Sequence, residues 1–599
     1  MKVSDCVLRA LERAGVDHVF TVSGGGIMHL IDSLGAHPRL RYTANYHEQA
    51  CAVAAEGYAR VRGPLGACLV TTGPGSTNAL TGVAGAWVDS IPMIVISGQV
   101  RRDLIADYSR LRQLGPQEIN IDAMAAPITK YLATVLDPSG IRFEMEKAIF
   151  IATSGRPGPV WINIPLDVQG ALIDEDAVPR FDPPDVEHAS VHLDAEKISL
   201  LLATAKRPVL VPGNGIRLAN AHRQFVALVD RLRIPVVPTI GGTDAIEEEH
   251  PLFVGRFGPL GQRRANFAVQ NADLIVAVGA SMSVSTVGFN TDAFAPGAIK
   301  VVVNVDAEEI KKVRPVPDVS IVADAREFIE ALLDATQTPV HEPHEEWRRA
   351  CEDWRNRYPA VTPQQRSEKD YVNSYLFADA LSDVLDEGET ILTGNSLDWW
   401  SVYQSFKIKR GQRVFTNVNY GSMGWDVPAA IGAAVARPGR RTVLVTGDGS
   451  FQFNSQELQT ISHYGLDLRI FLLNNAGYAS IRAMQQTHFA GRLVGADVSS
   501  GVSNPDFRAL AHAYRLRYTS IRSHPDLSSG LREALEGNGP VLCEVHINPA
   551  QERSPRVMSQ RREDGTMASG TLQNMYPFLP ADEVAHQMRF SRTGSLTRT

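Results

Sequence analysis

The sequence predicts three α/β domains, each built on a doubly wound parallel sheet. Apolar runs rich in Val, Ile and Leu alternate with helix-length amphipathic segments, as buried parallel strands alternate with their connecting helices. This alternation occupies three stretches, which are separated by two charged connectors that contain several prolines. The first and third stretches share a general βα pattern, as two related halves would. A chain of 599 residues is long enough for several such domains.

The first domain is expected at residues 1–172 and opens with MKVSDCVLRALERAGVDHVF, a capped amphipathic helix that leads into a strand. The second, at 190–336, contains the strand-like runs RPVLVPG, ADLIVAVGA and KVVVNVD. The third, at 370–550, contains RTVLVT and LRIFLL. A polar tail, 551–599, has one apolar island at MYPFL; we expect it to fold over the surface or an active site, with its last ten residues disordered.

The composition excludes several classes of protein. A net charge of −7 argues against a nucleic-acid surface, and no run approaches 18 apolar residues, so no membrane span is expected. The first residues lack the form of a signal peptide. The cysteines are five and scattered, without a CxxC pair, which favours a reduced cytoplasmic protein. They are Cys6, Cys51, Cys68, Cys351 and Cys543.

A metal site is predicted in GDGSFQFNSQELQTISHYGLDLRIFLLNN, residues 447–475. Its two strand-like runs and the helical spacing of FNSQELQTISHYG indicate a βαβ unit. Asp448 and Asn475 then lie at the carboxyl ends of neighbouring strands, the edge where open α/β sheets bind ligands. Their oxygens, with the main-chain carbonyl of Gly477, suit an octahedral Mg²⁺. The alternative is a plain G-D-G turn followed by an unrelated strand.

The whole of this stretch resembles the metal-diphosphate signature of thiamine-diphosphate (ThDP) enzymes. The resemblance implies that the backbone of Gly447, Gly449 and Ser450 approaches the diphosphate, which glycine permits. Upstream, Gly394 and Asn395 in ILTGNSLDWW match the usual diphosphate contact loop. A simple strand-to-helix turn is the alternative for these two residues.

A second set of motifs resembles the part of the family that activates the cofactor. Glu48 in YTANYHEQACAVAAEGYAR begins a helix, where a solvated acid is also favoured by the helix dipole. HEQACAVAAEGYAR resembles the helix whose glutamate drives the aminopyrimidine to its imino tautomer, which implies that role for Glu48. NVNYGSMGWDVPAAIGAA resembles the segment that bends the cofactor. The acceptor carbonyl is then that of Gly421 and the wedge is Met423, for which core packing is the alternative.

In this family the pyrimidine-binding domain of one subunit faces the diphosphate-binding domain of another. The resemblance therefore implies that Glu48 and Asp448 of one active site come from different chains. We expect a homodimer or homotetramer with active sites between subunits.

The resemblance extends over nearly the whole chain and is closest to the acetolactate synthase branch. It is carried by GRPGPVWINIPLDV, RPVLVPGNGI, ANFAVQNADLIVAVGA and GSMGWDVPAAIGAA. Members of that branch decarboxylate pyruvate and pass the bound carbanion to an acceptor carbonyl. Gln117 in LGPQEINI matches a glutamine that faces the carbanion, and Lys130 in PITKY matches a lysine near the cofactor channel. A loop residue and a solvated helix end are the respective alternatives.

The acceptor side departs from that branch. Where acetolactate synthases have an arginine for the carboxylate of a second 2-keto acid, this chain reads SMSVSTVGFN, which places Ser283 there. A tryptophan expected after the paired asparagines is also missing, and the same segment offers Arg482 instead. Because a guanidinium is the natural partner of a carboxylate, acetolactate formation is doubtful.

Two further segments, GYASIRAMQQTHF and PRVMSQRREDGTMASGTLQNMYPFL, resemble a sub-branch associated with sugar and natural-product biosynthesis. Its characterised type adds the acetyl unit of pyruvate to a keto group on a nucleotide-linked deoxy sugar. We therefore expect a ThDP-dependent carboligase that uses pyruvate or a similar 2-keto acid and a non-carboxylate aldehyde or ketone.

The central domain resembles the FAD-binding domain of acetolactate synthases, although the middle domains of some relatives carry no flavin. Gly213 and Gly215 in VLVPGNGI would let the backbone approach the dinucleotide. Asp306 and Asp324 end strands where ribose or adenine contacts occur. We expect a bound FAD with a structural role.

Other functions stay open. The chain could be an acetolactate synthase proper, or a flavin-dependent pyruvate oxidase, which would form hydrogen peroxide. A simple 2-keto-acid decarboxylase would need a proton donor; the sequence has no His-His pair and offers His29 and His47. A non-catalytic partner subunit should have lost Glu48 or the metal ligands, which this chain retains.

Overall fold

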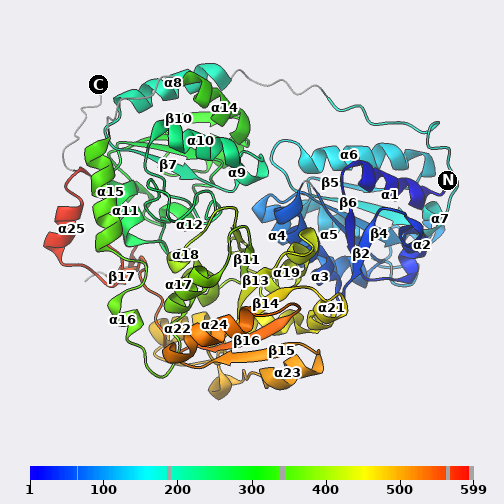
Figure 1. Cartoon of the computed structure of the whole chain (residues 1–599). Helices are drawn as coiled ribbons and strands as arrows, with labels where there is room; N and C mark the ends of the chain where they lie inside the picture. Colours follow the sequence, from blue (N-terminus) through cyan, green and yellow to red (C-terminus); the bar gives the residue numbers. More distant parts are fainter. Residues whose placement is uncertain (64, 185–190, 337–343, 562–566, 592–599) are drawn as a thin grey trace.

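The computed structural model describes residues 1–63, 65–184, 191–336, 344–561 and 567–591. Three parallel sheets with helices on their faces form three α/β units, as predicted (Figure 1). The first unit lies on one side of the molecule, and the middle and third units lie together on the other side (Figure 1). The disorder expected for the last ten residues falls almost wholly outside the described part of the chain.

The first sheet has six parallel strands in the order β2-β1-β3-β4-β6-β5. Its strands are β1 (His18–Thr21), β2 (Arg41–Ala44), β3 (Gly66–Val70), β4 (Met93–Gln99), β5 (Tyr131–Thr134) and β6 (Pro159–Pro165). Its helices are α1 (Val3–Arg13), α2 (Met28–Ala36), α3 (Glu48–Arg62), α4 (Pro74–Asp89), α5 (Ile121–Ala125), α6 (Ile141–Thr153) and α7 (Leu166–Gln169). Every residue of β3, β4 and β6 is buried, because helices cover both faces of the sheet's centre.

The middle sheet has four parallel strands in the order β10-β9-β8-β7. The strands are β7 (Pro208–Pro212), β8 (Leu274–Val278), β9 (Ile299–Asn304) and β10 (Val319–Val322), of which the first three are the apolar runs predicted above. The helices are α8 (Val191–Thr204), α9 (Gly215–Leu218), α10 (His222–Leu232), α11 (Arg263–Asn271), α12 (Val284–Val287), α13 (Ala307–Lys311) and α14 (Ala325–Ala335). The connector to the third unit carries α15 (Glu345–Arg357) and α16 (Pro363–Arg366).

The third sheet repeats the connectivity of the first, in the order β12-β11-β13-β14-β16-β15. This confirms that the two outer units share one pattern. The strands are β11 (Thr390–Thr393), β12 (Arg413–Phe415), β13 (Thr442–Gly447), β14 (Leu468–Asn474), β15 (Arg517–Ile521) and β16 (Val541–His546). The helices are α17 (Ser374–Val384), α18 (Leu397–Ser405), α19 (Asp426–Ala436), α20 (Asp448–Phe451), α21 (Leu458–His463), α22 (Ala479–His488), α23 (Phe507–Ala513) and α24 (Leu527–Leu535).

One predicted helix is wrong in detail. The segment between β13 and β14 is not one helix but α20, a 3₁₀ segment at Gln452–Glu457, and α21. Asn454 breaks the helical geometry (φ −134°, ψ 33°), because its side-chain amide donates to the carbonyl of Gly424 at 2.7 Å. A tertiary hydrogen bond therefore overrides the local helical pattern.

The first and third units pack through α3 and α19, whose Ala- and Gly-rich faces share one hydrophobic core. Gly57 lies directly against the carbonyl of Ala429, and Gly432 lies against that of Ala54. A side chain at either glycine would collide with backbone. The small residues thus serve close helix packing, in addition to any function in the cofactor site.

The tail lies on the middle unit (Figure 1). It comprises β17 (Gln560–Arg561), β18 (Met567–Ala568) and α25 (Ala581–Gln587). Arg263 donates to the carbonyl of Pro577 at 2.7 Å, and Trp354 donates its indole N–H to Gln587 at 2.8 Å. Met575, in the predicted apolar island, is fully buried.

None of the described helices combines the length and the apolar character needed to cross a membrane. The five cysteines are all free and buried.

Candidate active site

The predicted metal ligands lie at one edge of the third sheet. β13 and β14 are parallel neighbours, and Asp448 and Asn475 directly follow their carboxyl ends. The Asp448 carboxylate is fully buried and accepts hydrogen bonds from the amide of Gly477 at 2.9 Å and from the side chain of Asn504 at 2.6 Å. Burial raises the pKa of this carboxyl group, while these donors favour its charged form.

Asn475 carries the observation that points most directly to a metal. Its side-chain oxygen Oδ1 is buried and has no hydrogen-bond partner in the part of the chain that the structure describes. A buried unpaired acceptor is costly, and a cation would satisfy it. The carbonyl of Gly477 accepts one bond, from Ala479 at 3.1 Å, and keeps a second lone pair.

The donor set consists of one carboxylate, one amide oxygen and a main-chain carbonyl. No described group of three or more His, Cys, Asp or Glu side chains could hold a metal elsewhere. A mainly neutral set of oxygen atoms suits Mg²⁺, which shares its ligands with water and phosphate. The residues therefore fit the predicted ion.

Asn504 was not predicted. Besides Asp448, it donates to the side-chain oxygen of Asn474 at 3.1 Å, so it joins the ends of β13 and β14. Asn474 in turn donates to Glu544 at 2.7 Å. Only a turn-like SNPD in the sequence marks this position, and such a turn does not reveal its partners.

Of the two glycines in the G-D-G turn, Gly449 is the one whose surroundings leave no room for a side chain. A Cβ there would lie 2.5 Å from the ring of Tyr478 and 3.6 Å from the Met423 methyl carbon. Met423 is thus beside the turn that carries the predicted metal ligand Asp448. Gly447 has extended backbone (φ −82°) and no atom within 4 Å of where a Cβ would stand, so it leaves room for a ligand.

The remaining predicted diphosphate contacts lie on adjacent loops of the same edge. Asn395 donates its side-chain amide to the carbonyl of Gly421 at 2.6 Å, which links the loop after β11 to the one before α19. Ser450 accepts from the amide of Gly424 at 2.9 Å. Gly394 has no room for a side chain, because the carboxylate of Asp398 lies against it.

Glu48 lies at the corresponding edge of the first sheet, as the first residue of α3 after β2. Asn78 donates to its Oε2 at 2.9 Å, and Oε1 faces Gly75. Gln117 is exposed, with φ +64°, and its carbonyl lies directly against Gly73. The structure therefore brings Gln117 to the same edge as Glu48.

Within one chain, no hydrogen bond or ion pair among the described residues joins Glu48 to Asp448 or Asn475. The segment before Glu48 contacts the third unit elsewhere: Asn45 and the amide of Tyr46 both donate to the buried Glu457 at 2.9 Å.

The comparisons with known proteins cover all three units. The chain matches the thiamine pyrophosphate (TPP) enzyme N-terminal TPP binding domain at residues 1–126, the central domain at 195–332 and the C-terminal TPP binding domain at 393–545. It is 34% identical over 568 residues to a probable acetolactate synthase large subunit of Methanocaldococcus jannaschii, covering 92% of this chain and 93% of the relative.

The chain belongs to the thiamine pyrophosphate enzymes.

Other relatives agree with this assignment. The acetolactate synthase isozyme 2 large subunit of Escherichia coli is 33% identical over 563 residues, covering 93% of this chain and 97% of the relative. The large subunit of Pyropia yezoensis is 32% identical, covering 92% of each chain. The protein is therefore a ThDP-dependent enzyme of the acetolactate synthase-like carboligase type.

The two residues predicted for the acceptor pocket lie in different places. Arg482 is buried and donates to three main-chain carbonyls, those of Asn475 (3.0 Å), Ala476 (3.3 Å) and Pro549 (2.8 Å). It holds the loop of the predicted metal ligand Asn475 and is not free to meet an acceptor. Ser283 lies apart from it, in the wall of the central cavity described below.

Lys130 is at the amino end of β5, the opposite edge of the sheet from Glu48. Its ammonium donates to the carbonyls of Ile151 and Ser154 at the carboxyl end of α6, the latter at 2.7 Å. Burial lowers the pKa of Lys130 to about 8. Lys130 therefore caps a helix, where a cation is favoured, and lies away from the Glu48 edge where the cofactor is predicted.

Of the two histidines considered as proton donors, one caps a helix. The ring of His47 caps α3 by accepting from the amide of Gln49 at 3.1 Å, and His29 lies against Gly170.

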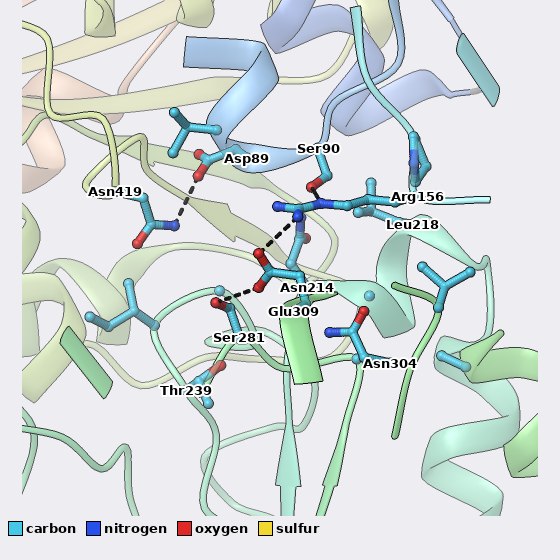
Figure 2. Close-up of a pocket in the computed structure, with 18 of the residues that line it drawn as sticks. Asp89, Ser90, Arg156, Asn214, Leu218, Thr239, Ser281, Asn304, Glu309 and Asn419 are labelled. Carbon is cyan, nitrogen blue, oxygen red and sulfur yellow. Dashed lines mark hydrogen bonds and ion pairs between the residues drawn. The ribbon is translucent and has the colours of Figure 1, made fainter. Parts of the chain in front are cut away.

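A cavity of about 400 Å³ opens where the three units meet (Figure 2). Arg156 points into it, donating to Ser90 at 2.8 Å and pairing with Glu309 at 2.8 Å and Asp306 at 3.1 Å. On the opposite wall Asn419 faces Asp89.

Of the four residues predicted to contact FAD, two line this cavity and two do not. Gly215 and Asp324 line it, and Asp324 also caps α14 by accepting from the amide of Arg326 at 2.8 Å. Asp306 is bound by Arg156, which lowers its pKa together with the amides of the α13 N-terminus, against the effect of burial. Gly213 packs directly against the carbonyl of Gly279, so close packing between loops already explains that glycine.

Proposed function

We propose that this ThDP-dependent enzyme decarboxylates pyruvate, or a similar 2-keto acid, and transfers the acyl carbanion equivalent to a neutral aldehyde or ketone. The observation that carries the proposal is the position of Arg482. The acceptor segment SMSVSTVGFN has no arginine, and Arg482 is bound to three carbonyls. The carboxylate of a second 2-keto acid would have no guanidinium from either predicted position, and desolvating it unpaired costs several kcal/mol.

On the cofactor side, Asp448, Asn475 and the Gly477 carbonyl would hold Mg²⁺ and, through it, the diphosphate. Met423 would keep the cofactor bent over the edge of the sheet. When bound, ThDP would supply a nucleophilic carbon and an electron sink for decarboxylation of the 2-keto acid. Glu48 would keep a proton between its Oε1 and the far ring nitrogen of the aminopyrimidine, with Asn78 fixing the carboxylate through Oε2.

A complete site on this proposal uses two copies of the chain, in a homodimer or a homotetramer. Within one chain, no hydrogen bond or ion pair among the described residues joins Glu48 to Asp448, and this supports the arrangement. The central cavity supports a bound FAD in a structural role, since its volume is within the usual range for ligand pockets. The buried free cysteines support a reducing compartment, the cytoplasm.

Acetolactate synthesis is the second candidate, favoured by relatives of that name that cover 92% of the chain. The deciding experiment supplies the holoenzyme with pyruvate alone, and then with pyruvate plus a panel of aldehydes, ketones and nucleotide-linked keto-sugars, with mass detection of all products. We expect slow acetolactate formation that a neutral acceptor diverts. Rapid acetolactate formation that no acceptor diverts would contradict the proposal. Hydrogen peroxide would indicate an oxidase.

A further inference from the structure

The start of the tail passes between the third and middle units. Gln404 of α18 donates to the carbonyl of Pro555 at 2.9 Å, and the amide of Val557 donates to the carbonyl of Pro259 at 2.7 Å. These bonds hold Arg553 and Arg556, which flank Pro555, beside α18.

Arg553 has an unusual environment for a guanidinium. It lies 4.0 Å above the ring of Trp400, and among the described residues it donates a single hydrogen bond, to the hydroxyl of Ser480 at 3.2 Å. Burial, and then the nearby Arg556, lower the pKa of Arg553 to about 10. Neither arginine forms an ion pair with any carboxylate of the described chain. Two neighbouring cations without an acid are unfavourable unless an anion joins them.

Both donors and acceptors beside Arg553 lack hydrogen-bond partners in the described chain; the acceptors are Oδ2 of Asp398 and Oε1 of Gln404. The indole Nε1 of Trp400, a residue only 9% exposed, and the Nε of Arg556 are buried without a partner among the described residues. Each of the nearest acids by sequence accepts a hydrogen bond from another group and forms no ion pair with Arg553 or Arg556 in the described structure. Glu552 accepts from the hydroxyl of Tyr576 at 3.0 Å, and Asp398 accepts from the amide of Ser396 at 2.8 Å. Buried donors are normally paired, and neither of these unpaired acceptors is bonded to the Trp400 indole N–H or to Nε of Arg556 in the described chain.

The same group adjoins the predicted diphosphate loop. The hydroxyl of Ser480, which holds Arg553, shares a hydrogen bond of 2.5 Å with the hydroxyl of Ser396. Ser396 follows Asn395 of that loop, and Ser480 is on α22, three residues after the metal-binding Gly477. Arg553 is therefore connected to the predicted diphosphate loop by two successive hydrogen bonds, one to Ser480 and one between Ser480 and Ser396.

We propose that Arg553, Arg556 and Trp400 bind a phosphoryl group. Two guanidinium groups and an indole N–H offer more donors than one carboxylate accepts, and they match the several oxygens of a phosphate or diphosphate. The phosphoryl group belongs either to the cofactor diphosphate or to the acceptor. In the second case the inference rests on the proposed function and narrows its acceptor to a phosphorylated or nucleotide-linked carbonyl compound.

The test compares Arg553→Gln with a matched control, Arg589→Gln. Arg589 also stacks on an aromatic ring, 4.5 Å from the centroid of Phe590, and donates to a single oxygen, the carbonyl of His586. Two affinities are measured for each protein: ThDP with saturating Mg²⁺, by fluorescence titration, and inorganic pyrophosphate added to the Mg²⁺–ThDP holoenzyme, by calorimetry. Thermal midpoints check folding. Trp400→Phe, which keeps the ring and removes the N–H, replaces Arg553→Gln if that variant does not fold.

Loss of a charged hydrogen bond predicts roughly 10- to 150-fold weaker binding in Arg553→Gln and no change in the control. If holoenzyme binds pyrophosphate and the variant loses that affinity alone, the group is on the acceptor. If only ThDP affinity falls, the group is the cofactor diphosphate. Equal values for Arg553→Gln and the control in both titrations would overturn the proposal. So would a selective loss of 2-ketobutyrate use, which would mark a carboxylate site. Neither titration depends on which acceptor the carboligation uses, so the proposed function is tested separately.

Discussion

Replacing Asn475 by alanine tests whether this residue is a metal ligand or has a structural role. The side-chain oxygen is buried and unpaired in the described structure, so removing it takes away no hydrogen bond to the described protein. We expect the free energy of unfolding of the cofactor-free protein to change by about 1 kcal/mol or less. The same change should weaken retention of Mg²⁺ and ThDP, because the ion loses one of its oxygen ligands.

The magnitude follows from linkage between binding and unfolding. At a ligand concentration of about 100 times the wild-type dissociation constant, Mg²⁺–ThDP stabilises the fold by about 2.7 kcal/mol. Loss of one interaction with a charged partner, worth about 1.5–3 kcal/mol, weakens binding roughly 10- to 150-fold. At the same concentration the stabilisation then falls to about 1.3 kcal/mol, or to about 0.3 kcal/mol at the upper limit.

The assay is denaturant unfolding of wild type, Asn475→Ala and Asn475→Asp, each with and without Mg²⁺ and ThDP. The aspartate keeps an oxygen at the same place and should retain most of the ligand-induced stabilisation. Two results would refute the reasoning. One is an alanine variant with the full wild-type stabilisation by ligand. The other is a cofactor-free alanine variant that has lost several kcal/mol, since the amide would then have a structural role.

Three further predictions concern other sites. Glu48→Gln should bind Mg²⁺ and ThDP as wild type does while turnover falls roughly 100-fold or more, and near-normal turnover would remove its assigned role. Burial, and then the neighbouring Asp426, raise the pKa of Asp398 to about 7, so the folded state favours the protonated acid. The stabilisation by the protonated acid is complete below about pH 4 and is lost as the pH rises to 7. Asp398→Asn should therefore become more stable relative to wild type over that pH interval, as measured by unfolding curves. A stability difference between the two proteins that does not change with pH would contradict this. Gly57→Ala should cost about 1–3 kcal/mol because its side chain meets a carbonyl of α19, whereas Gly35→Ala, in open space, should cost no measurable stability in the same melts.

The predicted architecture and the cofactor edges follow from the sequence because they depend on local patterns. Apolar runs of strand length predict β7, β8, β13 and β14, and residues directly after such strands must meet at one sheet edge. Asp448, Asn475 and Glu48 could be placed in this way. Their positions need no knowledge of distant contacts.

The residues that the sequence placed wrongly, or missed, depend on contacts between distant parts of the chain. Lys130 and Arg482 are cations whose partners are main-chain carbonyls, and every peptide offers such carbonyls, so residue type does not identify them. Asn454 breaks a helix through a bond to a loop 30 residues away in the sequence. Asn504, 56 residues from Asp448, has no motif at all. Long-range polar contacts of this kind become visible only once the chain is folded.

The equal strand orders of the first and third sheets have a consequence for the origin of the enzyme. Two sheets of identical connectivity in one chain are what duplication of an ancestral domain would leave. The position after β13 holds Asp448, and the position after its counterpart β3 holds Thr71, so one copy presents a carboxylate where the other presents a hydroxyl. The two copies would then have divided an ancestral binding surface, one keeping the metal and the other acquiring the acid at Glu48. Exchanging these loops between the copies would retrace that divergence.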